Sequence, residues 1–417
     1  MSDSPAADSP LPPKRNPFGL LFLIVLADML GFGIIIPMLP FYARKFEASN
    51  FAVTMLLSVY SFCQFVAAPI LGSLSDRIGR RPVLIFSQLG SASASIVLGI
   101  ATAIHFDSAA LGLGIIYLSR IVDGISGGNI SAAQAYVSDV TTPDQRAKYM
   151  GLLGAAFGIG FALGPGIGGV LGHFNPAFPP FAAAAFSLTA AVLAYFRLPE
   201  SLTHRAPHQP GWHITRSARL MRYPVLAQLV LVWFLSMFAF VTMESVFAIF
   251  LNDRFGFGEL GVGLTFMLAG VMIILVQGKL IGPLKSWLGE WNLAIIGPLL
   301  FAVAMLLYAR TSVTPLVAIL VVAVMFNALG RSLQTPTLSS LVSTAAPPGG
   351  QGAAFGLFHG MGSLSRVFGP ALAGLMYDRQ IMSPFMLAAA LTVIAGLWMI
   401  GIRAQTRPAT TLAPEAA

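Results

Sequence analysis

The ten residues Gly72-Ser-Leu-Ser-Asp-Arg-Ile-Gly-Arg-Arg81 form a short charged stretch between two long apolar runs, residues 52–73 and 82–104. A related stretch, Gly282-Pro-Leu-Lys-Ser-Trp-Leu-Gly289, begins 210 residues later, again between apolar runs. Two further similar stretches, Gly164-Pro-Gly-Ile-Gly-Gly169 and Gly369-Pro-Ala-Leu-Ala-Gly374, are 205 residues apart. The nearly equal offsets indicate an internal duplication of the chain.

The composition around these stretches is that of an integral membrane protein. Of the 417 residues, 56% are hydrophobic and only 10% are charged, whereas soluble domains carry about 25% charged residues. Twelve apolar runs are long enough to cross a hydrocarbon core of about 30 Å as helices. We therefore predict an all-α membrane protein with 12 transmembrane helices in two pseudo-symmetric six-helix bundles. The runs are residues 18–41, 52–73, 82–104, 110–134, 147–172, 180–198, 224–250, 260–283, 291–309, 314–337, 352–376 and 384–403.

Polar segments divide the chain and indicate its orientation. We expect a disordered cytosolic tail (1–17), an N-terminal bundle (18–199), a cytoplasmic linker loop (200–223), a C-terminal bundle (224–403) and a second cytosolic tail (404–417). Sixteen of the 24 Lys and Arg residues fall on the side that holds both termini, and five fall on the other side. Basic loops favour the cytoplasm, so we expect a monomeric, multi-pass protein of a bacterial inner membrane with both termini inside.

Several classes of function lack the residues that would carry them. The twelve runs leave almost no chain for a soluble catalytic domain, and neither a phosphate-binding loop nor a nucleophile elbow is present. The single cysteine, Cys63, lies in an apolar run, which excludes an intrachain disulfide and a cysteine metal cluster. We expect no enzymatic activity, no cofactor, no bound metal and no nucleic-acid partner.

These motifs resemble those of a known family. The stretch from Gly72 to Arg81 resembles the loop signature of the major facilitator superfamily, and Arg120-Ile-Val-Asp-Gly-Ile-Ser-Gly-Gly128 resembles its span-4 motif. Asp28-Met-Leu-Gly-Phe-Gly-Ile-Ile-Ile-Pro-Met-Leu-Pro40 together with Gln64 is similar to the 12-span drug:proton antiporters, most of all the tetracycline exporters. The resemblance implies a substrate path between the halves. The chain departs from those exporters in span 3, where residues 90–95 carry no acid, and in spans 8 and 9, which lack a buried His or Asp.

Six charged residues lie inside the predicted spans and away from the span ends, three acidic and three basic. Charges there are costly, so they are expected to be paired and functional. Asp28 stands near the middle of span 1, and a carboxylate whose access to water alternates between sides can carry protons. We interpret Asp28 as the principal proton-coupling and substrate-binding residue; the alternative is a permanent partner for a neighbouring polar group. The six are Asp28, Asp123, Glu244, Arg120, Arg331 and Arg366.

In span 4, Arg120, Asp123 and Gln134 recur on one face of a continuous helix. Arg120 and Asp123 are one turn apart, so they form either a structural ion pair or a proton-coupling pair in which Arg120 stabilises an ionised aspartate in one state only. The superfamily's span-4 arginine implies the second role. Gln64 and Gln134 are predicted to line the substrate path.

In span 7, Glu244 lies among aromatic residues that include Phe238, a setting that suits an apolar cation. Arg331 and Arg366 are either anion sites or counter-ions to Glu244. The predicted substrate-binding residues are therefore Asp28, Gln64, Gln134, Phe238, Glu244 and Arg331.

Two motifs are assigned by the resemblance. It implies that Asp76, Arg77 and Arg80 form a charge network with Asp139 and with span 11, which latches the outward-facing state. The corresponding acid and arginine are absent from the second copy, where Ser286 and Trp287 stand. The antiporter motif is carried by Gly164, Pro165, Gly168 and Gly169, and small residues there let another helix pack closely.

We therefore predict a proton-coupled antiporter that exports amphipathic or cationic small molecules, tetracycline-like compounds among them, by alternating access. One alternative is a proton-coupled uptake symporter for a sugar or an organic anion, on the same fold. Another, from a different class, is a membrane receptor or scaffold that transports nothing.

Overall fold

The computed structural model describes residues 17–202, 220–347 and 350–406. The expected tails and most of the expected linker loop lie outside these residues. Within them the regular structure is entirely helical. Eleven helices or continuous helical runs are long and apolar enough to span a membrane. Helix α15 (Gln351–Arg379) is 29 residues long but is not one of the eleven, because its middle carries His359, Ser363, Ser365 and Arg366.

The first half (residues 17–202) contains α1 (Pro17–Ile35), η1 (Ile36–Met38), α2 (Leu39–Arg44), α3 (Asn50–Ile78), α4 (Arg80–Ala103), α5 (Ala109–Ser126), η2 (Gly127–Asn129), α6 (Ile130–Val140), α7 (Pro143–Phe174) and α8 (Phe178–Arg197). Two spans are interrupted. The run α1–η1–α2 changes to a tighter turn at Pro37, which has no backbone N–H to donate. The run α5–η2–α6 is interrupted at Gly127 and Gly128.

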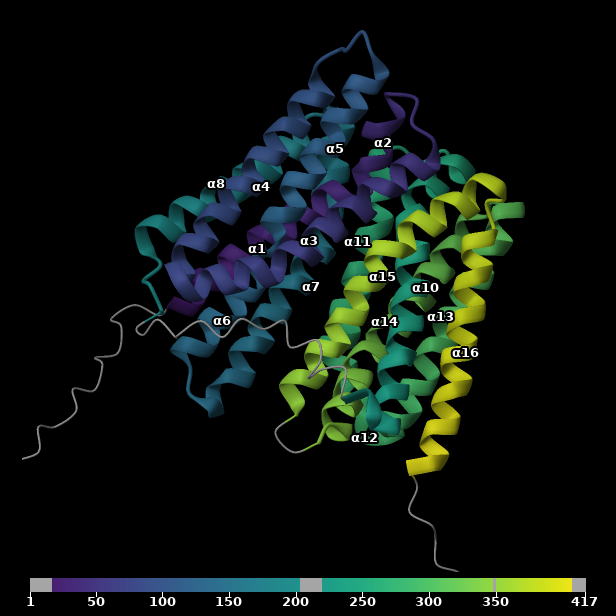
Figure 1. The fold of residues 1–417 in the computed structure, drawn as a ribbon. Helices are drawn as coiled ribbons and strands as arrows, with labels where there is room; N and C mark the ends of the chain where they lie inside the picture. Colours follow the sequence, from purple (N-terminus) through teal and green to yellow (C-terminus); the bar gives the residue numbers. More distant parts are fainter. Residues whose placement is uncertain (1–16, 203–219, 348–349, 407–417) are drawn as a thin grey trace, which may run out of the picture.

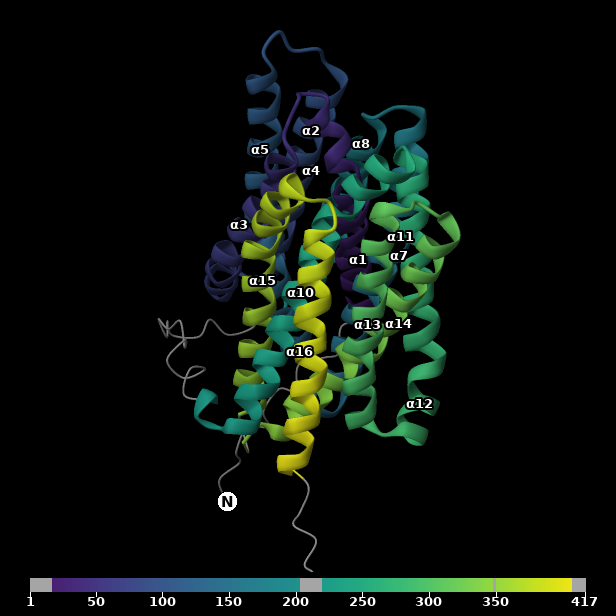
Figure 2. The same cartoon turned by 90° about the vertical axis from the view of Figure 1, so that its right-hand side faces the viewer.

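The second half (residues 220–406) contains η3 (Leu220–Arg222), α10 (Pro224–Phe255), α11 (Glu259–Leu275), the π-helical turn η4 (Val276–Leu280), α12 (Ile281–Leu288), α13 (Glu290–Val313), α14 (Val317–Ala345), α15 and α16 (Ser383–Thr406). Figure 1 shows the purple to teal helices of the first half grouped beside the green to yellow helices of the second. Figure 2 shows the long helices running roughly side by side along the height of the molecule.

The halves meet along two pairs of helices. Helix α7 packs against α11, and α3 packs against α15, while the other extensive packing lies within each half. The bundle has two ends, which we call the Arg80 end and the Arg44 end. The Arg80 end holds the α3–α4 corner and the beginnings of α7 and α10; the Arg44 end holds the end of α2 and the beginnings of α3 and α11.

The backbone repeats the duplication that the sequence indicates. Gly79, between α3 and α4, has φ +111°, and Gly289, between α12 and α13, has φ +78°. Both values fall in the region that favours glycine. The two charged stretches therefore make the same sharp corner between two helices.

Candidate functional site

Asp28 lies on α1 and contacts the point where the α5–α6 run is interrupted. The side-chain amide of Asn129 donates a hydrogen bond of 2.6 Å to Asp28 Oδ2. Asn129 itself is almost fully buried, and it ends the η2 turn. Asn129 was not among the predicted site residues, although its position after Gly127-Gly128, where a helix is easily interrupted, was a usable signal. The interruption directs a neutral amide at the buried carboxylate.

Arg120 and Asp123 form a direct pair on α5, next to Asp28. The distance from Arg120 Nη1 to Asp123 Oδ2 is 3.1 Å, and Arg120 is only 3% exposed. The other terminal nitrogen of Arg120, Nη2, is buried without a hydrogen-bond partner within the described residues. A guanidinium group presents five N–H donors, so Arg120 retains donor capacity beyond its pair with Asp123.

Asp28 and Asp123 both line one small cavity of about 20 Å³, which is enough for a water molecule. Gln64 also lines this cavity. Its side-chain amide donates hydrogen bonds to the carbonyl of Gly127, at 2.9 Å, and to the hydroxyl of Tyr60, at 3.3 Å. The structure thus brings Asp28, Asp123 and Gln64 together. Gln134 instead lies exposed on α6, away from this cavity. The prediction that Gln134 shares a polar face with Arg120 and Asp123 assumed one continuous helix, and η2 interrupts that helix.

In the second half, Arg331 is surrounded by aromatic rings. Its guanidinium carbon lies 4.1 Å from the centre of the Phe240 ring and 5.7 Å from that of Trp233. Phe238 does not take part; its ring lies 5.8 Å from that of Phe234. Residues two positions apart on a helix point in nearly opposite directions. The aromatic partner of Arg331 is therefore Phe240.

Glu244 lies one turn beyond Phe240 on α10 and lines a second small cavity, of about 10 Å³. This cavity lies between the halves, because Pro37, Pro40 and Leu57 of the first half line it together with Phe266 of the second. In the described part of the chain, Glu244 forms no ion pair with Arg331 or Arg366.

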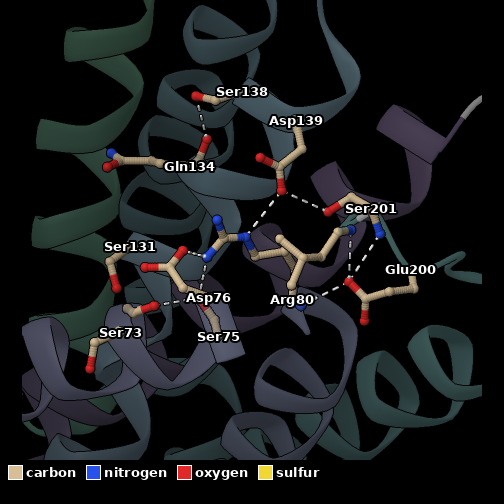
Figure 3. A network of polar contacts seen from close by, with 12 residues as sticks. Ser73, Ser75, Asp76, Arg80, Ser131, Gln134, Ser138, Asp139, Glu200 and Ser201 are labelled. Atoms are coloured by element: carbon tan, nitrogen blue, oxygen red, sulfur yellow. Dashed lines mark hydrogen bonds and ion pairs between the residues drawn. The ribbon is translucent and has the colours of Figure 1, made fainter. Parts of the chain in front are cut away.

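A charge network occupies the Arg80 end of the first half (Figure 3). Arg80 Nη1 lies 2.5 Å from Asp76 Oδ1, and Arg80 Nε lies 3.0 Å from Asp139 Oδ2. Arg80 also donates a hydrogen bond of 2.6 Å to Ser75 Oγ, and Ser201 Oγ donates one of 3.0 Å to Asp139. Arg77, on the same corner, is exposed.

Glu200, which was not among the predicted site residues, also belongs to this network. Its carboxylate accepts hydrogen bonds from the backbone N–H groups of Arg80 and Arg81, at 2.8 and 3.2 Å. These N–H groups begin α4, and a helix N-terminus attracts negative charge. Glu200 thereby fastens the end of the first half to the α3–α4 corner.

The second half has a counterpart of this network with the charges reversed. Glu290 follows Gly289 as Arg80 follows Gly79; it pairs with Lys285 and accepts 2.7 Å from Ser340 Oγ. The second copy was predicted to lack the charged pair. The prediction compared only the positions that correspond to Asp76 and Arg77. It therefore overlooked the pair of Lys285 and Glu290, in which the acid follows the second glycine of the stretch, Gly289.

At the Arg44 end, polar contacts cross between the halves. Arg44 donates to Asp253 at 2.7 and 3.1 Å and to Asn252 at 2.8 Å. Asn50 and the backbone of Phe51 donate to Asp378, at 2.9 and 3.2 Å. The carboxylates at the ends of α10 and α15 are thus held by the first half.

The four residues of the antiporter motif pack in two directions. A Cβ at Gly164 or Gly168 would come within 2.8 Å of the backbone of α1, and one at Gly169 within 2.8 Å of Gly263 on α11. Pro165 stands inside α7, and its carbonyl faces Gly263. The glycines therefore allow α7 to approach both α1 and the second half.

Comparisons with known proteins place these features in context. Residues 21–318 and 288–416 match the Major Facilitator Superfamily. The chain is 31% identical to multidrug resistance protein 2 of Bacillus subtilis (strain 168), over 91% of this chain and 94% of that protein. It is 30% identical to the class C tetracycline resistance protein of Escherichia coli, over 93% and 94% of the two chains.

Solved structures have the same fold. The human organic anion transporter MFSD10 (TETRAN) matches with a TM-score of 0.69 and 25% identity, over 93% of this chain and all of that one. A peptide transporter, POT, in complex with sulfate matches with a TM-score of 0.77 and 15% identity, over 94% and 96% of the two chains. Within residues 17–202, 220–347 and 350–406, no group of three or more His, Cys, Asp and Glu side chains is placed to hold a metal ion.

Proposed function

Since this chain belongs to the Major Facilitator Superfamily, we propose that it is a proton-coupled antiporter that exports amphipathic or cationic small molecules by alternating access. In this proposal α15 is the twelfth span, each half is a six-helix bundle, and the protein works as a monomer in a bacterial inner membrane. The Arg80 end, where most Lys and Arg residues gather, faces the cytoplasm. The names of the multidrug and tetracycline resistance relatives support the assignment to drug export.

The observation that carries the proposal is the buried group of Asp28, Asn129, Asp123 and Arg120. Asp28 accepts a hydrogen bond from a neutral amide and not from an arginine. A carboxylate without a fixed cation can be occupied in turn by a proton or by a cationic substrate. Asp123, in contrast, is paired with Arg120. We assign the exchanged proton to Asp28 and a stabilising role to the Arg120–Asp123 pair.

The polar contacts between Arg44 and Asp253 and between Asn50 and Asp378 support an inward-facing state. In that state the Arg44 end is closed and Asp28 releases its proton to the cytoplasm. A drug then binds, the Arg80 end closes, and the network of Asp76, Arg80 and Asp139 reorganises as the halves rock. The cycle ends when external protons displace the drug at Asp28.

The test uses everted membrane vesicles, acidified inside, with a pH-sensitive dye. Adding a lipophilic cation or a tetracycline to wild type is expected to release protons from the lumen. Asp28→Asn removes the titrating group while keeping its shape, so it is expected to abolish this release. Asp107→Asn, which removes an exposed acid at the Arg44 end, is the matched control and should behave as wild type.

Two results would contradict the proposal. One is undiminished proton release in a folded Asp28→Asn protein. The other is the absence of release with every compound tested, sugars and organic acids included, in a wild-type protein shown to be folded; this would favour the symporter or the scaffold.

A further inference from the structure

Arg331 and its aromatic neighbour Trp233 carry donor groups that no acceptor in the described part of the chain satisfies. Arg331 Nη1 and the indole N–H of Trp233 are both buried without a hydrogen-bond partner, and Trp233 is 95% buried. Leaving a buried donor unpaired destabilises the folded protein, and more so if the donor is charged. Two such donors on neighbouring side chains indicate a place for an acceptor.

The surroundings hold these donors in position. The Trp233 ring is stacked on Phe358 with centroids 4.2 Å apart, and Arg331 Nη2 lies 3.6 Å from the sulfur of Met237. Gly362 lies beside the indole, and a Cβ there would stand only 3.2 Å from the Trp233 nitrogen. A glycine at this position of α15 therefore leaves the N–H accessible.

No described acidic side chain is in direct contact with Arg331. Arg331 stands halfway along α14, where an isolated charge in a membrane is expensive. Glu244 and Arg366 are within electrostatic range of Arg331. Among the described residues, however, no carboxylate, that of Glu244 included, forms an ion pair with Arg331. A structural counter-ion would be in contact, so the positive charge of Arg331 remains available to a ligand.

From this arrangement we propose that Arg331 and Trp233 form a subsite for the carboxylate of an amphipathic aromatic molecule, whose ring packs against Phe240 and Met237. The inference rests on the proposed export function and deepens it. The first half supplies the carboxylate that exchanges a proton, and the second half recognises an anionic group. Zwitterionic and anionic aromatic compounds then belong to the substrate range beside cations.

Calorimetric titration of the purified, full-length protein tests the subsite without a proton gradient. The probes are 2-naphthoate and 2-naphthamide, which share a ring and differ in charge. Wild type is expected to bind naphthoate at least about tenfold more tightly than naphthamide, since a charge-assisted hydrogen bond is stronger than one between neutral groups. Arg331→Met is expected to lose this preference, and Arg331→Lys to keep part of it.

A second variant guards against misfolding. Trp233→Phe keeps a ring on Phe358 and removes only the N–H, so it should weaken naphthoate about three- to tenfold and weaken naphthamide less, because a neutral amide carbonyl is a weaker acceptor than a carboxylate. Arg310→Met, which removes an exposed arginine at the Arg44 end, should change neither affinity. Equal affinity of wild type for both probes, or an unchanged preference in folded Arg331→Met or Trp233→Phe, would overturn the subsite.

The outcomes for subsite and function are separable. Preferential naphthoate binding by a protein that never releases protons would contradict the antiporter and support the subsite. Proton release driven by cations, in a protein with no naphthoate preference, would do the reverse.

Discussion

The two ends of the bundle are built from similar residues, but they differ in what those residues contact. At the Arg44 end, Arg44 and Asn50 reach across to Asp253 and Asp378 of the other half. At the Arg80 end, Arg80 and Glu290 each contact partners within their own half. The polar groups of one end hold the halves together, and those of the other hold each half in shape.

The glycines of α7 show the same difference along a single helix face. Gly169 and Gly151 are 18 residues apart, which is five turns, so they point the same way. Gly169 packs against α11, whereas no described atom lies within 4 Å of a Cβ at Gly151. Gly374 and Gly356 of α15, also 18 residues apart, differ likewise. An alternating-access cycle would exchange these environments.

The largest expected effect comes from breaking the packed end. Gly169→Leu forces α7 and α11 apart, because its Cβ alone would come within 2.6 Å of the Glu259 carbonyl. Overpacking costs about 1–3 kcal/mol, and we expect a lower melting temperature and loss of transport. Gly151→Leu, on the same face, should leave the melting temperature unchanged and slow transport by obstructing closure of the Arg80 end. Equal destabilisation by both would contradict the comparison.

The next effect concerns the Arg80 network. Arg80→Met removes the donor shared by Ser75, Asp76 and Asp139, and we expect a stability loss of about 2 kcal/mol together with reduced transport. Chemical denaturation of the purified protein measures the loss. Arg222→Met, which alters an exposed arginine just before α10 at the same end of the bundle, serves as the control. A smaller loss for Arg80→Met than for the control would count against a structural role.

A smaller change is expected when the contact between the halves is weakened. Asp253→Asn removes the ion pair with Arg44, whose side chains are 29% and 27% exposed. Pairs of this kind contribute about 1 kcal/mol, which corresponds to about a fivefold population shift toward opening at the Arg44 end. Spin labels at positions 107 and 315, in a Cys63→Ser background, would report a longer distance. An unchanged distance distribution would show that the pair does not bias the equilibrium.

The smallest effect is expected at the reversed pair of the second half. Glu290→Gln keeps the hydrogen bond with Ser340 and loses the charge toward Lys285, which is 53% exposed. Exposed pairs contribute about 0–1 kcal/mol, so stability should change by less than about 0.5 kcal/mol and transport should stay near wild type. A loss as large as that of Arg80→Met would mean that the two networks are functional equals.

The sequence indicated the members of the first-half site better than their partners. Asp28, Asp123 and Gln64 were recognisable because polar residues in apolar runs are rare, and they do share a cavity. Asn129 and Glu200 were not recognisable, since one depends on the interrupted helix at η2 and the other on a contact 120 residues away along the chain. Gln134 and Phe238 were assigned by assuming continuous helices and by composition, which does not specify the direction of a side chain.

The sequence by itself determined the helices, the duplication and the inventory of buried charges. These follow from local properties, because an apolar run in lipid must satisfy its own backbone hydrogen bonds. The tertiary structure decided at which end polar contacts connect the two halves, and which charged side chains contact one another. Those features depend on how two independently formed halves dock. Because the glycine faces of α7 and α15 extend to both ends, and charged residues stand at both ends, the sequence is compatible with either end being joined.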